Sequence, residues 1–395
     1  MHPFTFSHPE RIHSMDVLRG IAILAIFWLN LPAFSIPLEF AHSLGWDQGQ
    51  ISQSDRMFFS LNTLLLDGTF ITLFTLLFGA GMALLHQQTG PAYLQRRLWW
   101  LCLFGLLHLV LIWPGDILLS YALSGGFILY RGYLELGQQE LRQKVKKFAV
   151  ITLLLYTVFT LLLVAMMLSE EGFSLAMSAE EIAAAKALHS GPYAAILRQH
   201  FTEAVMLLIS FPLSLLWLNL SLMLLGVYLL RSNWFQTGFN RETTLMLAFG
   251  GITLNGLTLM LALTSDFQIQ LQKQAFWSPF AAAMLALSLG SVVIHSRRAS
   301  KGWLQSWLAP CGKMAFTLYL SQSLVMVGLL RFVVPDWYLT LTKTDMALIA
   351  ILGIGLQLLL ARWYLQRFQQ GPLETLWRKL SQRPANKSPV EVKQP

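Results

Sequence analysis

The feature that most constrains this chain is a series of about ten apolar stretches, each close to the roughly 20 residues that a helix needs to cross a bilayer core. Hydrophobic residues make up 55% of the 395 residues and charged residues only 12%, a composition that ordinary water-soluble domains lack. The sequence therefore predicts an all-α fold, a polytopic membrane bundle of about ten transmembrane helices. These lie near residues 17–36, 57–85, 98–114, 117–134, 148–168, 205–230, 243–264, 276–295, 307–333 and 345–366.

The distribution of Lys and Arg predicts the orientation of the bundle, because cytoplasmic loops retain positive charge. With the N-terminus inside, all but six of the 28 Lys and Arg residues fall in cytoplasmic segments or span ends. We therefore expect both termini in the cytoplasm. The net charge of +8 then reflects topology and attraction to anionic membrane lipids, and no nucleic-acid partner is expected. The six exceptions are Arg56, Lys186, Arg198, Lys273, Arg331 and Lys343.

The chain is expected to form one membrane domain. Residues 1–16 would be a cytoplasmic N-terminus and residues 17–380 a single polytopic transmembrane domain. Residues 381–395 are polar and contain proline, which predicts a disordered cytoplasmic tail. In the outer loop 169–199, the sequence Ser178-Ala-Glu-Glu predicts a capped surface helix. This helix would be either a lid or a solvated connector.

The chain has two cysteines, Cys102 and Cys311. Neither is expected to face an oxidising compartment, so a disulfide framework is not predicted. No Cys or His stands at metal-ligand spacing from either cysteine, so no metal site is predicted.

His108 stands in the middle of the apolar run Leu101 to Trp113. Eleven residues after Arg97, at 1.5 Å each, place it about 16 Å along its span and near the bilayer midplane. An ionisable residue is costly there, so we expect His108 to face the bundle interior. It would either carry chemistry or be a neutral imidazole hydrogen-bonded to a neighbouring helix.

Two aspartates, Asp116 and Asp67, are candidate partners of His108. Pro114-Gly115 interrupts the helix before Asp116, so direct pairing with His108 requires this turn to fold the aspartate back. Asp116 also precedes an apolar helix, where an aspartate is a favoured N-cap. Asp67-Gly68 divides the second stretch similarly, and its aspartate could cap the deeper helix. A His with one or two carboxylates in an outer cavity would form a general-base arrangement.

The cytoplasmic side has a basic character. Asp16 and Arg19 are three residues apart, so they share a helix face and are expected to pair. If spans 1, 3 and 9 adjoin, four cations gather in one region and could bind a phosphate-bearing ligand. These cations are Arg19, Arg96, Arg97 and Lys313.

Polar residues enter the apolar span that follows Lys313. Tyr319 and Gln322 share a helix face and are candidates to line a cavity, whereas Ser and Thr there usually join helices. The segment Gly79-Ala-Gly81 favours close helix packing over phosphate binding. The sequence contains no GxSxG elbow, Walker-type phosphate loop or HExxH zinc helix.

An ordered set of motifs between residues 11 and 378 resembles the bacterial YeiB-type family, a polytopic inner-membrane group of unknown function. The sequence departs from the family pattern at Leu318, where relatives tend to be polar, and at Lys313, where arginine is commoner. The departure at Leu318 argues against a catalytic side chain on span 9. The motifs are Met15-Asp-Val-Leu-Arg-Gly20 with Asn30, Phe70 to Gly79-Ala-Gly81, His108 to Gly115-Asp116-Ile-Leu, Gly312-Lys-Met-Ala, and Gln370-Gly-Pro-Leu-Glu-Thr-Leu-Trp377.

The resemblance implies a distant kinship with transmembrane acyltransferases and a bacterial inner-membrane location. Such proteins are thought to take an acyl group from cytoplasmic acyl-CoA and to pass it across the membrane, using an embedded histidine. The resemblance implies His108 as base or transient acyl carrier, supported by Asp116 or Asp67. It also implies that Arg19, Arg96 and Arg97 bind the CoA phosphates, and Lys313 is a further candidate for this site. The candidates to line a cavity are Asp16, Asn30, Tyr319 and Gln322, and the expected acceptor is a carbohydrate, lipid or amine.

Two alternatives remain open at this point. The same buried His and Asp residues could relay protons in a transporter of a small or anionic solute. The chain could also be a non-catalytic membrane partner whose buried charges only join helices.

Overall fold

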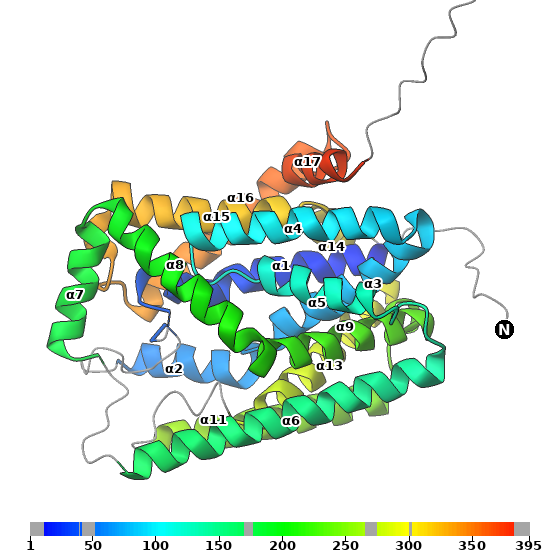
Figure 1. Ribbon diagram of the computed structural model, residues 1–395, viewed down its shortest axis with the longest axis horizontal. Helices are drawn as coiled ribbons and strands as arrows, with labels where there is room; N and C mark the ends of the chain where they lie inside the picture. Colours follow the sequence, from blue (N-terminus) through cyan, green and yellow to red (C-terminus); the bar gives the residue numbers. More distant parts are fainter. Residues whose placement is uncertain are drawn as a thin grey trace, which may run out of the picture.

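The computed structural model describes residues 12–38, 40–41, 52–169, 177–264, 275–299 and 302–382, and these residues form helices and connecting turns without a strand. Most of the predicted N-terminal segment 1–16 and of the predicted tail 381–395 lies outside this range. The helices are α1 (His13–Ser35), α2 (Gln53–Leu61), η1 (Asn62–Leu66), α3 (Thr69–Thr89), α4 (Pro91–Leu111), α5 (Leu118–Tyr130), α6 (Gln138–Ser169), α7 (Ala179–Ser190), α8 (Tyr193–Ser210), η2 (Phe211–Leu213), α9 (Leu215–Arg231), α10 (Trp234–Thr237), α11 (Arg241–Thr264), α13 (Ser278–Ala299), α14 (Trp303–Lys313), α15 (Ala315–Gly328), η3 (Leu329–Val333), η4 (Pro335–Trp337), α16 (Lys343–Leu365) and α17 (Pro372–Ser381). Figure 1 shows several long helices, among them α1, α4, α6 and α16, running roughly along the long axis of the molecule, whereas α8 crosses it obliquely.

Eight of the described segments are long and apolar enough to cross a membrane, and α8 with α9 makes a ninth if the bent pair counts as one span. The predicted all-α membrane bundle is therefore confirmed. Two of the ten expected spans differ in form. The stretch 117–134 yields α5, a helix of 13 residues that covers only about 20 Å at 1.5 Å per residue. The stretch 205–230 is bent by 63°, where Pro212 interrupts the helix.

Glycines allow two pairs of helices to pack closely in the core. A Cβ atom added at Gly79 of α3 would lie 2.1 Å from the carbonyl oxygen of Met223 in α9, so no side chain fits there. Gly312 of α14 meets α1 in the same way, since its Cβ would lie 1.8 Å from the Asp16 carbonyl oxygen. Small residues at such crossings let helix backbones approach in the membrane. The prediction that Gly79 serves packing is thus supported, whereas Gly81 has open space beside it.

One end of the bundle carries α7, which stands upright at the left of Figure 1. The predicted capping box begins this helix: Ser178 Oγ accepts from Glu181 N at 3.2 Å, and Glu181 Oε2 accepts from Ser178 N at 2.7 Å. At its other end the His189 ring stacks on the Tyr338 ring, with 3.9 Å between centroids. Arg331 also donates to the backbone carbonyls of His189 and Gly191. The helix is therefore docked onto the bundle end at its C-terminus.

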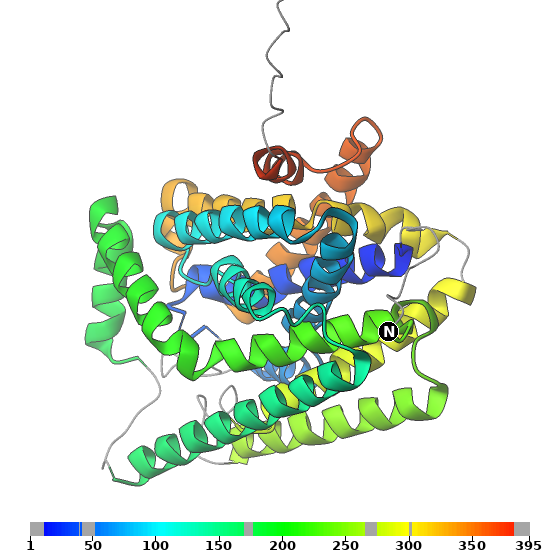
Figure 2. The same ribbon diagram turned by 45° about the vertical axis from the view of Figure 1, so that its right-hand side comes forward.

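Toward the other end, α17 lies across the outside of the bundle, at the top of Figure 1. Side chains of α4 hold its last turn: Trp100 Nε1 donates to the Leu380 carbonyl at 2.9 Å and Arg96 Nε donates to the Ser381 carbonyl at 2.8 Å. Figure 2 shows α6 and α11 at the lower edge of the molecule, away from α17. The bent pair α8 and α9 lies between these two faces in that view.

Candidate functional site

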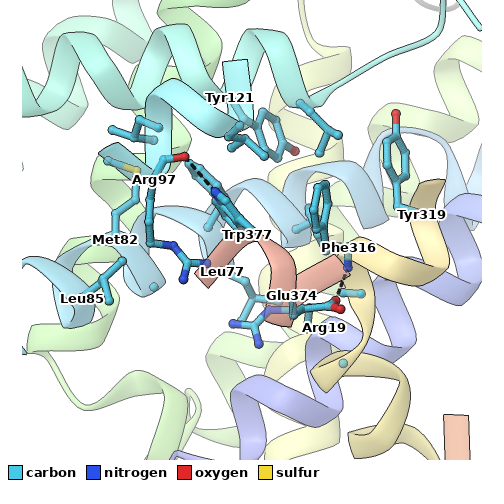
Figure 3. A pocket seen from close by; sticks show the side chains of 18 of the residues that line it. Arg19, Leu77, Met82, Leu85, Arg97, Tyr121, Phe316, Tyr319, Glu374 and Trp377 are labelled. Atoms are coloured by element: carbon cyan, nitrogen blue, oxygen red, sulfur yellow. Dashed lines mark hydrogen bonds between the residues drawn. The ribbon is translucent and has the colours of Figure 1, made fainter. Parts of the chain in front are cut away.

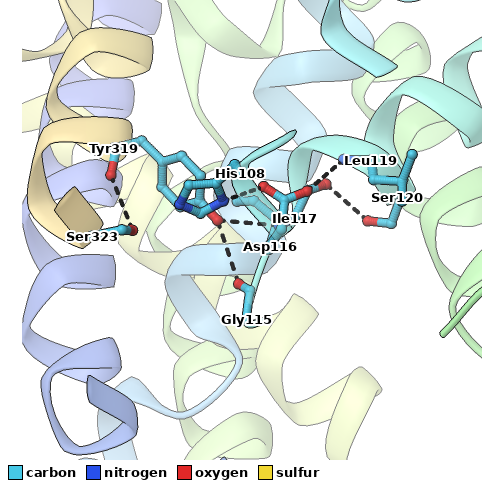
Figure 4. Close-up of polar contacts among 8 residues, drawn as sticks. All are labelled: His108, Gly115, Asp116, Ile117, Leu119, Ser120, Tyr319 and Ser323. Atoms are coloured by element: carbon cyan, nitrogen blue, oxygen red, sulfur yellow. Dashed lines mark hydrogen bonds and ion pairs between the residues drawn. The ribbon is translucent and has the colours of Figure 1, made fainter. Parts of the chain in front are cut away.

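The centre of the candidate site is a buried pair formed by His108 and Asp116. Nδ1 of His108 and Oδ1 of Asp116 are 2.8 Å apart, and the two residues are 1% and 6% exposed (Figure 4). The second carboxylate oxygen of Asp116 accepts from the Leu119 backbone N–H at 2.7 Å, in the first turn of α5. The two roles left open by the sequence, helix cap and partner of His108, are therefore both filled by one carboxylate.

The turn between α4 and α5 brings the pair together. The helix α4 closes on His108, whose carbonyl accepts from both Ile112 N and Trp113 N at 2.9 Å. Gly115 is required where the chain reverses, because a Cβ there would lie 2.3 Å from the Trp113 ring. Gly105, one turn before His108, faces α5 without a side chain, and a Cβ there would lie 3.0 Å from Asp116 Oδ2. Gly105 thus leaves room for the returning carboxylate, and Gly115 leaves room for the Trp113 ring.

The partner at Nδ1 determines which tautomer a neutral His108 adopts. A carboxylate only accepts hydrogen bonds, so Nδ1 must carry the proton and Nε2 must present its lone pair. Nε2 is buried and has no hydrogen-bond partner among the described residues. The arrangement is that of a general base whose basic nitrogen is unused and whose imidazolium would be stabilised by Asp116.

Aromatic rings surround the imidazole. The Tyr319 ring of α15 lies beside it with 5.3 Å between ring centroids, and the Trp113 ring meets it at 6.3 Å in an edge arrangement. The Tyr319 hydroxyl accepts from Ile117 N at 3.1 Å and donates to the Gly115 carbonyl at 3.4 Å, so it holds the turn that carries Asp116 (Figure 4). Tyr319 thus both shields His108 and positions its partner.

A cavity of about 320 Å³ lies on the Tyr319 side of the pair, and we call it the basic cavity. Three of the four predicted cations, Arg19, Arg97 and Lys313, line it. Figure 3 labels the two arginines. The deeper part of the cavity is apolar and aromatic and reaches Tyr121 and Tyr319. Spans 1, 3 and 9 therefore meet as predicted. The cations lie near one end of the cavity, and Tyr319, whose ring covers His108, lies at the other.

The helix α17 contributes two side chains to the basic cavity that were not among the predicted site residues. Glu374 Oε1 accepts from the Phe316 and Thr317 backbone N–H groups at 2.8 and 3.1 Å, which caps the N-terminus of α15. Trp377 lies under the Arg97 guanidinium, 3.7 Å from the ring centroid, and its Nε1 donates to the Arg97 carbonyl at 2.9 Å. The sequence signal for both residues was the family motif Gln370-Gly-Pro-Leu-Glu-Thr-Leu-Trp377, which assigns no role to either of them.

A second cavity, of about 470 Å³, lies on the Asp116 side of the pair, and we call it the polar cavity. Asp67 and Asp116, the two candidate partners of His108, line it together with Asn30. It also has amide and hydroxyl groups that sequence reasoning missed, from Asn219, Asn255, Ser120, Tyr156, Thr258 and Ser278.

A thin layer of side chains separates the two cavities. Tyr121 lines both of them, and its hydroxyl lies 2.5 Å from the Thr75 hydroxyl, which faces the polar cavity. Asp116 lines the polar cavity and Tyr319 the basic one, while His108 lies between them and lines neither. Arg19 and Asn30 of α1 are eleven residues apart, about 16 Å along a helix, so the cavities also differ in depth.

The remaining predicted residues lie elsewhere. Arg96 is bonded to the end of α17 and does not line the basic cavity. Asp16 is buried and lies 3.3 Å from Arg19, as its spacing predicted. Gln322 joins helices, since its Nε2 donates to Gln357 Oε1 at 2.7 Å. Gly68 holds the N-cap position of α3, and Asp67 directly precedes it.

Comparisons with known proteins give relatives without an assigned activity. Residues 229–384 match a family described as a protein of unknown function (DUF418). The chain is 30% identical to the uncharacterized protein YeiB of Escherichia coli (strain K12), over 95% of this chain and 97% of YeiB. It is 28% identical to the uncharacterized protein YxaH of Bacillus subtilis (strain 168), over 93% of this chain and 94% of YxaH. No solved structure matches.

Proposed function

This chain belongs to the YeiB-like family of membrane proteins of unknown function, and we propose that it is a membrane acyltransferase. In this proposal it moves an acyl group from cytoplasmic acyl-CoA to an extracytoplasmic or membrane-embedded acceptor. The observation that carries the proposal is the His108–Asp116 pair, which has an unused basic nitrogen and lies between a cationic cavity and a polar one.

The basic cavity would bind the donor. Arg19, Arg97 and Lys313 offer charge-assisted hydrogen bonds to phosphate groups, and the Trp377 ring beside Arg97 offers a stacking surface. The apolar and aromatic depth of the cavity suits the acyl end of the donor and directs it toward Tyr319. The excess of Lys and Arg at the cytoplasmic side of the predicted topology supports a position of this cavity toward the cytoplasm in a bacterial inner membrane.

The polar cavity would bind the acceptor, and His108 would move the proton. The reacting hydroxyl or amine of the acceptor would pass Asp116 to reach the Nε2 side of the imidazole. Nε2 then takes a proton from this group as it attacks the thioester carbonyl carbon. The carbon–sulfur bond then breaks, and the imidazolium returns the proton to the leaving sulfur, so CoA departs as the thiol. Asp116 stabilises the imidazolium and keeps Nδ1 protonated throughout. Nε2 could also carry the acyl group transiently in the same place.

Access to Nε2 requires movement of Tyr319. Its ring lies against the imidazole, and Nε2 is buried. The hydroxyl of Tyr319 has only two hydrogen bonds to the turn, from Ile117 and to Gly115. Binding of the acyl chain in the basic cavity, which Tyr319 lines, is a direct way to displace the ring. A gated base would also protect the thioester from water.

The two cavities on opposite sides of one buried pair also favour a second candidate, a transporter coupled to protons. A purely structural membrane partner has no use for the cationic cavity.

One experiment separates these functions. The purified full chain in lipid vesicles would be supplied with acetyl-CoA or a long-chain acyl-CoA and an extract of bacterial lipids and saccharides. Acceptor-dependent release of CoA thiol with a labelled acylated product is the result expected of an acyltransferase. Solute uptake that follows a pH gradient without any CoA would instead identify a transporter. A chain that shows neither acyl transfer nor solute uptake, but that binds another membrane protein stably, would have a structural role.

A further inference from the structure

The charge of the polar cavity limits what it can bind. Two carboxylates, Asp67 and Asp116, line it, and no Lys, Arg or His does so among the described residues. The His108 ring is hydrogen-bonded behind Asp116, and Lys343 lines a smaller neighbouring cavity together with Asp67. An anionic group placed here would lose its water without gaining a cation, which is unfavourable in a buried site.

The remaining lining combines apolar side chains, such as Ile26, Leu218 and Leu222, with neutral hydrogen-bonding groups. Asn30, Asn219 and Asn255 supply amides, and several Ser, Thr and Tyr residues supply hydroxyls. Such groups recognise hydroxyl and amine groups by orientation rather than by charge.

One of these groups is unused. Thr63 is 3% exposed and lines the cavity, and its hydroxyl is buried without a hydrogen-bond partner among the described residues. Buried polar groups are nearly always hydrogen-bonded. An unpaired hydroxyl at the wall of a polar cavity therefore points to a polar ligand that completes the bond.

We infer that the polar cavity selects an acceptor that bears no anionic group: a small uncharged or cationic compound rich in hydroxyl or amine groups. This inference rests on the proposed function and narrows its acceptor. Asp67 and Asp116 accept hydrogen bonds from the donor groups of such a compound, and the negative charge of the two carboxylates favours a protonated amine. Phosphorylated and carboxylated acceptors are excluded from the polar cavity, and such anions can bind only in the basic cavity.

The test uses three hexoses that differ mainly in charge: glucosamine, glucose and glucuronate. Binding of each to the purified full chain in lipid nanodiscs would be measured calorimetrically without acyl-CoA. We expect glucosamine and glucose to bind at least tenfold more tightly than glucuronate. Equal or tighter binding of glucuronate, or binding of none of the three, would overturn the inference.

Two variants make the test specific to this cavity. Asp67→Asn should reduce the preference for glucosamine over glucose while leaving glucose affinity within about twofold, and the exposed Asp336→Asn should change neither. An Asp67→Asn variant with unchanged preference would also overturn the inference. These measurements contain no CoA, so the preference for uncharged and cationic hexoses is measured independently of donor binding. If this preference is found but a separate titration shows that the chain does not bind CoA, the inference stands and only the proposed acyltransferase function is contradicted.

Discussion

Nδ1 of His108 lies 2.8 Å from Oδ1 of Asp116, although the residues are eight positions apart and a Pro-Gly turn lies between them. The same carboxylate caps the first turn of α5 through Leu119. One side chain therefore fixes the tautomer of the histidine and the start of the next helix.

Replacing Asp116 should separate its two roles. Asp116→Ala removes the cap, worth about 1 kcal/mol, and leaves the buried Nδ1–H unpaired, which costs roughly 1–3 kcal/mol more. Asp116→Asn can still cap Leu119 through its carbonyl oxygen, while its amide N–H₂ favours the tautomer protonated at Nε2. We expect near-normal unfolding but lost acyl transfer for Asn, and both defects for Ala. Unfolding in detergent and a ¹⁵N spectrum of the histidines would check this, and a full-activity Asn variant would contradict it.

The four cations predicted from the sequence should not be equivalent. Arg97→Gln should weaken CoA binding about tenfold or more, since a hydrogen bond to a charged group is worth roughly 1.5–3 kcal/mol. Arg96→Gln should leave CoA affinity nearly unchanged, because Arg96 binds the carbonyl of Ser381 outside the basic cavity. Calorimetric titration of CoA into the two matched variants measures the difference. The reverse order of effects would show that the donor binds elsewhere.

Two glycines two residues apart in α3 should respond oppositely to alanine. In Gly79→Ala the new methyl group would meet the Met223 carbonyl at 2.1 Å, and overpacking of this kind destabilises by roughly 1–3 kcal/mol. Gly81→Ala has open space and should be neutral or slightly stabilising, since alanine favours helix. Thermal unfolding in detergent compares the two variants, and equal loss in both would refute the close crossing of α3 and α9.

Docking of α7 should weaken in acid. Burial lowers the pKa of His189 below its ordinary 6.5, and its neutral Nε2–H donates to the Leu330 carbonyl at 3.0 Å. Because the undocked state binds the proton more readily, docking is strongest above pH 6.5 and is lost as the pH falls through the lowered pKa. Hydrogen exchange of α7 amides at pH 7.5 and pH 5, corrected for intrinsic rates, should show this. His189→Gln keeps an N–H donor for the Leu330 carbonyl and should abolish most of the pH dependence of exchange in α7, whereas the control His86→Gln should retain it. An unchanged pH dependence in His189→Gln would contradict the role of His189.

Local features of the fold could be predicted from the sequence because they depend on neighbours along the chain. Hydropathy located the helices, the spacing of Asp16 and Arg19 predicted their pair, and the capping box predicted the start of α7. The bend at Pro212 and the shortness of α5 were missed. A run of apolar residues indicates that a segment lies in an apolar environment, but it does not indicate the direction of the helix axis.

Features that join distant segments could not be predicted in this way. Glu374 reaches Phe316 across 58 positions and Trp377 reaches Arg97 across 280, and no local pattern encodes such contacts. Arg96 and Arg97 also looked equivalent in the sequence, because their different contacts with α17 join distant segments. Adjacent positions on a helix point about 100° apart, so the two side chains face different surroundings. The contact between His108 and Asp116 was partly predictable. The sequence identified both residues as candidates, but the conformation of the short turn between them determines whether they are in contact.

The most direct measurement of the central claim is acyl transfer by His108→Gln in lipid vesicles, beside wild-type protein and His86→Gln. Loss of a positioned base typically lowers a rate about 10²- to 10⁴-fold, so we expect such a fall in His108→Gln with CoA binding and unfolding temperature close to those of the wild type. Unchanged acyl transfer in a folded His108→Gln variant would contradict the account.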